Sequence, residues 1–129
     1  MDTIGDFLTR IRNAGMAKHD RLDIPSSKSR VGIAKILEDK GYIRSFKVAK
    51  DNKQGLMRVY LKYDKEGNHV ISQVHRISKP SRRVYIRSNE IKPVRSGFGL
   101  SVLSTNKGII SGDDAANQNV GGELLFEMW

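Results

Sequence analysis

The stretch from residue 100 to residue 123 constrains the fold of this chain most strongly. Leu100, Val102 and Leu103 alternate with small hydroxyl residues, a pattern that predicts a strand. Residues 104–108 interrupt this strand with two hydroxyls, a carboxamide, an ammonium group and a glycine. These five positions predict a polar loop that combines short donors and acceptors with one long cation.

A short helix and a final strand follow this loop in the prediction. Asp113 and Asp114 indicate a helix start, because aspartate caps unpaired N–H groups and suits the positive end of the helix dipole. Residues 115–118 would form the helix body, the glycines at 121 and 122 would end it, and residues 123–129 predict the last strand. Such an arrangement is common in α+β domains, so the stretch alone leaves a purely structural role open.

The charge of the chain is distributed unevenly. A formal net charge of +9 on 129 residues favours a polyanionic partner. Residues 1–99 hold 22 of the 23 Lys and Arg and 10 of the 14 Asp and Glu, whereas residues 100–129 hold one Lys and four acids. If the partner is nucleic acid, phosphate attraction comes mainly from the first 99 residues. The polar loop is then predicted to read bases.

Several classes of function are disfavoured by the sequence. No apolar run approaches the roughly 18 residues that span a bilayer, and the first residues lack a signal-peptide pattern, so we expect a cytoplasmic protein without a membrane partner. No hydrolase elbow, Walker loop or dinucleotide fingerprint occurs. The three histidines lack zinc-site spacing, and there is no cysteine. We expect no enzyme activity, cofactor, metal or small-molecule substrate.

Residues 1–66 predict an N-terminal unit of two helices on one face of a three-stranded sheet. The predicted elements are, in order, a helix after Asp2 or Thr3, a strand at 21–25, a helix from Ser26–Ser27 to Gly41, and strands at 42–48 and 56–63 joined by a polar turn at 51–55. The buried side of the second helix is predicted to comprise Val31, Ala34, Ile36 and Leu37. Residues 67–129 predict a second unit that is mostly β, with one short helix. The fold class is therefore α+β with two small domains.

Two groups of cations are candidates for phosphate contacts. Arg82 and Arg83 follow a turn at Pro80, and Tyr85 stands in a predicted strand beside them, an arrangement that suits contact with an RNA backbone and stacking on a base. Lys28 and Arg30 fall in the first turn of the second helix, where cations oppose the dipole but N–H groups favour phosphate. A solvated face, a solvated helix start and an ordinary sheet aromatic remain the alternatives.

Three motifs resemble the bacterial ribosomal small-subunit protein eight family. They are the Ser-Thr-x-Lys-Gly run at 104–108 with its later Gly-Gly-Glu, the first-helix segment at 4–14, and the basic segment at 76–85. The three motifs occur in the family's order and span nearly the whole chain. The resemblance implies a structural, primary rRNA-binding protein that attaches to the central domain of 16S rRNA and helps to assemble the platform of the small subunit.

The resemblance also implies site residues and partners. It places base-reading contacts on the polar loop and further contacts at the Lys28, Arg30, Tyr85 and Glu123 positions. With the two arginines chosen for their charge, the predicted RNA-binding residues are Ser104, Thr105, Asn106, Lys107, Gly108, Tyr85, Arg82, Arg83, Lys28, Arg30 and Glu123. Asn106 stands where serine is frequent in the family, and Ser81 where glycine is usual.

Proteins five and twelve of the small subunit are implied as neighbours. In some bacteria the family also represses translation of its own operon, which makes that activity a further expectation. The rival from another class is a basic protein-interaction or assembly module without specific RNA recognition.

Overall fold

The computed structural model describes residues 2–50 and 55–129, which divide into two compact units. Thr3–Ile71 forms the N-terminal unit, and Ser72–Trp129 together with Asp2 forms the C-terminal unit. Most of the predicted turn at 51–55 lies outside the described residues. The α+β class is confirmed, whereas the division into domains at 1–66 and 67–129 stays a prediction. Among the described residues, no helix is long and apolar enough to cross a membrane.

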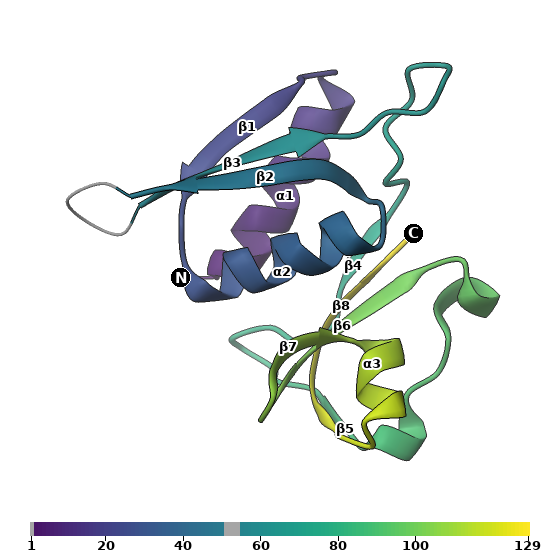
Figure 1. Ribbon diagram of the computed structural model, residues 1–129. Helices are drawn as coiled ribbons and strands as arrows, with labels where there is room; N and C mark the ends of the chain where they lie inside the picture. Colours follow the sequence, from purple (N-terminus) through teal and green to yellow (C-terminus); the bar gives the residue numbers. More distant parts are fainter. Residues whose placement is uncertain (1, 51–54) are drawn as a thin grey trace. The chain divides into compact units, whose positions relative to one another are not determined.

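The N-terminal unit contains two helices and three strands in the predicted order. They are α1 (Thr3–Met16), β1 (Arg21–Pro25), α2 (Lys28–Asp39), β2 (Ile43–Ala49) and β3 (Leu56–Leu61). The antiparallel sheet has the order β1-β3-β2, so β3 is central and the strand that ends in proline lies at an edge. Figure 1 shows both helices on one face of this sheet.

The core of this unit follows the hydrophobic periodicity of its elements. Phe7, Leu8 and Ile11 lie on one side of α1 and are buried, while Met57 and Val59 alternate along β3 and are fully buried. The buried side of α2 differs from the prediction. Its buried residues are Arg30, Ile33, Ala34 and Leu37, and the Val31 and Ile36 positions are only half-buried.

The C-terminal unit is built around a central strand. Its elements are β4 (Val74–Arg76), β5 (Tyr85–Ile86), β6 (Leu100–Thr105), β7 (Gly108–Ser111), α3 (Gly112–Asn117) and β8 (Gly122–Met128), with 3-10 turns at Ser88–Glu90 and Val94–Gly97. The sheet order is β4-β8-β6-β7, and β5 also pairs with β8. All pairings are antiparallel. β8 therefore carries β4 and β5 along one edge and β6 along the other.

Two details of this unit correct the sequence-based prediction. The predicted loop at 104–108 is the tip of a hairpin, because β6 continues through Thr105 and pairs there with Gly108. The predicted helix cap at Asp113 and Asp114 is also wrong. Ser111 is the N-cap, and its Oγ accepts the backbone N–H of Asp114 at 3.2 Å.

Candidate nucleic-acid interface

A row of predicted site residues crosses the C-terminal sheet. Tyr85 on β5 lies opposite Glu123 on β8, and Glu123 lies opposite Ser104 on β6. Directly opposite residues of adjacent strands project to the same face of a sheet. The three side chains therefore share one face, although 38 residues of sequence separate Tyr85 from Glu123. Tyr85 is 69% exposed, which is unusual for a large aromatic residue and leaves its ring open to a ligand.

The tip of the β6–β7 hairpin presents short polar groups beside this row. The Thr105 hydroxyl donates to the carbonyl of Gly108 at 2.9 Å and accepts the backbone N–H of Lys107 at 3.1 Å. Gly108 has φ +101°, a conformation that favours glycine. Asn106 and Lys107 are exposed, and Ser104 is half-buried. Thr105 therefore stabilises the turn, while the other three side chains face outward from it or border it.

Glu123 connects the row to the basic segment before β5. Its Oε2 atom accepts hydrogen bonds from the Ser78 hydroxyl and from Nη1 of Arg83, the latter at 3.0 Å. Burial raises the pKa of Glu123, but these two hydrogen bonds and the charges of Arg83 and Arg76 outweigh burial, so the pKa lies below its ordinary value of 4.5. The carboxylate thus stays ionised at neutral pH and positions the Arg83 guanidinium.

Ser78 is a residue of this site that the sequence reasoning missed. It is fully buried, and its Oγ also accepts the backbone N–H of Val84 at 3.1 Å. The serine thereby ties the segment that follows β4 to the segment that precedes β5. No local sequence signal marks this role, because the partners lie six and 45 residues away along the chain.

Arg82 occupies a tight turn and is exposed. The backbone N–H groups of Lys79 and Arg82 each donate to the other residue's carbonyl, at 2.9 and 3.0 Å. Pro80 and Ser81 form the tip between them. Ser81 is not among the non-glycine residues with positive φ, so the backbone of this turn accepts a serine where the family usually has glycine. The Arg82 side chain is exposed, whereas the guanidinium of Arg83 is paired with Glu123.

The two cations predicted on α2 have different environments. Lys28 is exposed and borders a hollow of about 410 Å³ that Lys35 also lines. Arg30 is only 6% exposed. Its guanidinium donates to the carbonyls of Thr3 and Pro25 at 3.3 and 2.8 Å, and to Oδ2 of Asp6 at 3.1 Å. The side chain thus joins α1, β1 and α2 inside the N-terminal unit, and the phosphate contact of Arg30 stays a prediction.

The arrangement on the C-terminal sheet suits nucleic acid. An exposed aromatic ring can stack on a base, hydroxyl and amide groups can pair with base edges or 2′-hydroxyls, and the exposed cations can meet phosphates. Among the described residues, no group of three His, Asp or Glu side chains could hold a metal ion. The fold and the site therefore define a basic, two-unit α+β protein of the RNA-binding class.

Comparison with known proteins identifies the family. Residues 2–129 match the model of ribosomal protein S8. The small ribosomal subunit protein uS8 of Bdellovibrio bacteriovorus is 61% identical over 129 residues, which is the whole of both chains. The proteins of the same name from Geotalea daltonii and Thermodesulfovibrio yellowstonii are 53% and 47% identical over 128 residues, which cover 99% of this chain and 97% and 98% of theirs.

The chain belongs to the ribosomal protein S8 family. It is therefore a structural constituent of the small subunit of the cytoplasmic ribosome and not an enzyme. This membership confirms the resemblance drawn from the three sequence motifs. The rival prediction of a protein-interaction module without RNA recognition is not supported.

A first prediction concerns the carboxylate of Glu123. Because its pKa is lowered in the folded state, its ionised form stabilises the protein above pH 4.5, and this contribution is lost as the pH falls through the folded-state pKa. Glu123→Gln should lower the free energy of unfolding at neutral pH by about 1–2 kcal/mol, because charged hydrogen bonds become neutral ones. It should also lose less stability than the wild type on acidification.

Urea unfolding at about pH 7 and about pH 3.5 measures both effects. Glu127→Gln is the matched control, because Glu127 lies on the same strand and opposite Ser101 rather than in the Ser78–Arg83 cluster. Equal acid sensitivity of Glu123→Gln and the wild type would show that the carboxylate does not hold this cluster together.

Proposed function

We propose that the chain binds ribosomal RNA through the predicted domain 67–129, of which residues 72–129 belong to the C-terminal unit. The observation that carries this proposal is the alignment of Tyr85, Glu123 and Ser104 across three adjacent strands. Their register places three groups on one face of the sheet. They are the exposed ring of Tyr85, the hydroxyl of Ser104 and the carboxylate of Glu123, which is paired with the guanidinium of Arg83. A rigid sheet presents these groups in a fixed geometry, which specific recognition needs.

Each group has a distinct role in the proposed complex. The Tyr85 ring stacks on an unpaired base or a sugar, since an A-form helix hides its own base faces and its major groove. Ser104 and Asn106 pair with base edges or 2′-hydroxyls, while Thr105 and Gly108 maintain the turn that carries them. Lys107 and Arg82 meet phosphates, and Lys28 is a separate phosphate contact on the N-terminal unit. Glu123 acts through Arg83, whose Nη1 atom lies 3.0 Å from Oε2 of Glu123.

Finer features of this function rest on the family resemblance alone. We propose that the RNA is the central domain of 16S rRNA, that binding helps to assemble the platform, and that proteins five and twelve lie next to the bound protein. Crosslinking of intact small subunits that contain a tagged copy of the chain tests the rRNA domain and the two neighbours. Crosslinks should map to the central domain and to those two proteins, and crosslinks confined to another rRNA domain would contradict the proposal.

Substitutions separate the reading of bases from the attraction of phosphate. Ser104→Ala leaves the net charge unchanged and should weaken binding to the cognate rRNA fragment by about 1–3 kcal/mol, with little effect on unrelated RNA. Arg82→Gln should weaken binding to all RNAs alike and reduce the salt slope by roughly one unit or less. Filter binding at several salt concentrations measures both effects.

Controls on folding complete this comparison. Thr105→Val removes the hydroxyl that stabilises the hairpin turn, so it should lower thermal stability as well as RNA affinity. Ser104→Ala should lower RNA affinity alone, because its hydroxyl is not part of that turn. Wild-type affinity of Ser104→Ala for the cognate fragment at matched salt would contradict base reading at this hairpin.

The family resemblance also supports a regulatory role. We propose that the chain represses translation of its own operon by binding an mRNA segment that imitates the rRNA site. A reporter that carries the leader of the native operon should be repressed when the wild-type chain is overexpressed, and less so with Ser104→Ala. A reporter that does not respond to the wild type would restrict the protein to its ribosomal role.

A further inference from the structure

We propose that the face of the N-terminal sheet away from the helices is a second RNA-binding surface, specific for an unpaired stretch of RNA. In this surface the ring of Tyr60 stacks on a base, and Arg21, Arg44 and Lys47 hold the flanking phosphates. The proposal is independent of the C-terminal row and of its partner. It rests on the register of β1, β3 and β2, on the surroundings of Tyr60 and on the charge of the unit.

The register of the sheet places Tyr60 on the central strand, near one end of this face. Arg21 on β1 and Ser45 on β2 lie opposite Tyr60 on β3, and side chains alternate along β3 between the two faces of the sheet. Met57 and Val59 point to the helices and are fully buried. Leu56, Arg58 and Tyr60 therefore point to the opposite face, which α1 and α2 do not cover (Figure 1).

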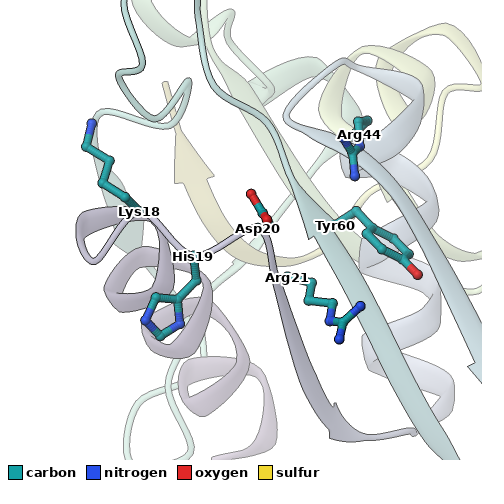
Figure 2. Close-up of a pocket in the computed structure, with 6 residues that line it drawn as sticks. All are labelled: Lys18, His19, Asp20, Arg21, Arg44 and Tyr60. Atoms are coloured by element: carbon teal, nitrogen blue, oxygen red, sulfur yellow. The ribbon is translucent and has the colours of Figure 1, made fainter.

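Cations surround the Tyr60 ring. The Cζ atom of Arg44 lies 5.5 Å and the Nζ atom of Lys47 lies 5.8 Å from the ring centroid. Tyr60 also lines an open hollow of about 710 Å³, shown in Figure 2, whose other lining residues are Lys18, His19, Asp20, Arg21 and Arg44. This volume lies within the range of about 300–1,000 Å³ that is usual for sites of small organic groups, so it has room for a base.

A second hollow extends the surface along the same face. It measures about 380 Å³ and is lined by Lys47, Val48, Ala49, Leu56, Arg58 and Tyr60. Tyr60 thus separates two hollows, with cations in each. Leu56 is 41% exposed and adds apolar area on which a neighbouring base or sugar can pack. The surface is therefore long enough for more than one nucleotide and has an aromatic platform in its middle.

The charges of this face favour an anionic ligand. Asp23 is neutralised by Arg58, whose Nε and Nη2 donate to its two carboxylate oxygens at 2.7 and 3.1 Å. The hydrogen bond from Arg58 is the main cause that lowers the pKa of Asp23. Asp20 is the acid that lines the first hollow. Its charge is outnumbered by four cations along the two hollows, namely Lys18, Arg21, Arg44 and Lys47. Phosphates complement this excess of positive charge.

The same conclusion follows from the whole N-terminal unit. Residues 3–71 hold 15 Lys and Arg against eight Asp and Glu, so they contribute +7 to a total net charge of +9. Of the two cations predicted in this unit as RNA contacts, Arg30 is buried and engaged inside the fold. Lys28 accounts for one of the seven surplus charges, whereas the sheet face accounts for three, with Lys18, Arg21, Arg44 and Lys47 against Asp20.

The aromatic ring identifies the class of polyanion. An acidic peptide would use the cations but not the ring, and paired bases in a duplex do not expose their faces to a sheet. A groove that combines cations with a central aromatic is the usual arrangement for binding a single strand, because every base can stack on the ring and the cations follow the backbone. The geometry therefore points to unpaired RNA.

Binding of a fluorescent ten-nucleotide oligouridine to the full-length chain tests the proposal, because this probe lacks the folded rRNA site that the C-terminal row is proposed to read. Tyr60→Leu should weaken binding roughly fivefold or more, the effect of losing one base stack, while Tyr60→Phe should keep it. Arg44→Gln and Lys47→Gln should each reduce the salt slope by roughly 0.7, the value for one phosphate of a single strand.

Two control variants locate the probe. Lys40→Gln removes one charge at the C-terminal end of α2, on the helical side of the unit, and should keep the wild-type salt slope apart from a weak long-range effect. Tyr85→Leu, on the other exposed aromatic ring, should leave binding of oligouridine unchanged, while it weakens binding of the rRNA fragment. Arg44 and Lys47 are exposed, so their variants remain informative if Tyr60→Leu lowers thermal stability.

Several results would overturn the proposal. They are wild-type affinity in Tyr60→Leu, an equal loss in Tyr60→Phe, equal affinity for a ten-base-pair RNA duplex, and equally effective competition by decaglutamate. An oligouridine affinity that falls with Tyr85→Leu as far as with Tyr60→Leu would also overturn it, because the probe would then occupy the C-terminal row.

Discussion

The pairing of β8 along both of its edges is the constraint on which the candidate interface depends. Tyr85, Glu123 and Ser104 come from three strands, and only the register of β8 with β5 and β6 puts them on one face. A slip of one residue would turn Glu123 to the opposite face. Gly122 permits the close approach of β8 to β6, because a Cβ there would lie 2.3 Å from the carbonyl oxygen of Ser104. The recognition geometry is thus a property of the sheet and not of a mobile loop.

Charged side chains inside each unit support this framework and are separate from those that can meet a ligand. Arg30 joins α1, β1 and α2 through two carbonyls and Asp6. Glu123 joins β8 to the segment between β4 and β5 through Ser78 and Arg83. Breaking a buried, hydrogen-bonded charge leaves its partners unsatisfied, which costs several kcal/mol. Such residues are therefore structural even in a protein whose function depends on charge. Their substitution would lower RNA binding through folding, so stability must be measured beside affinity.

Local sequence rules were sufficient wherever a residue's own neighbours decide its conformation. The helix α2 begins after Ser27 and ends before Gly41, as predicted. Ser27 caps it by accepting the N–H of Arg30, and Gly41 has φ +82°. The same rules failed where distant residues decide. The strand β7 forms because residues 108–111 pair with β6, and Ser78 is buried because β8 covers it. Arg30 looks like a solvated cation at a helix start, yet three oxygens from 5 to 27 residues away enclose it.

Two surfaces on separate sheets would contribute differently to RNA binding, one to specificity and the other to affinity and association rate. The C-terminal row offers few charges but several directional groups, so it favours one RNA over another. The N-terminal face offers many charges around one ring, and stacking on a ring tolerates every base, so it adds affinity and on-rate with little specificity. A chain with a net charge of +9 concentrated in one unit can thus be captured by any nearby single strand before its other unit finds the matching site. Specific and nonspecific binding would then depend on salt to different degrees, because their phosphate contacts lie on different units.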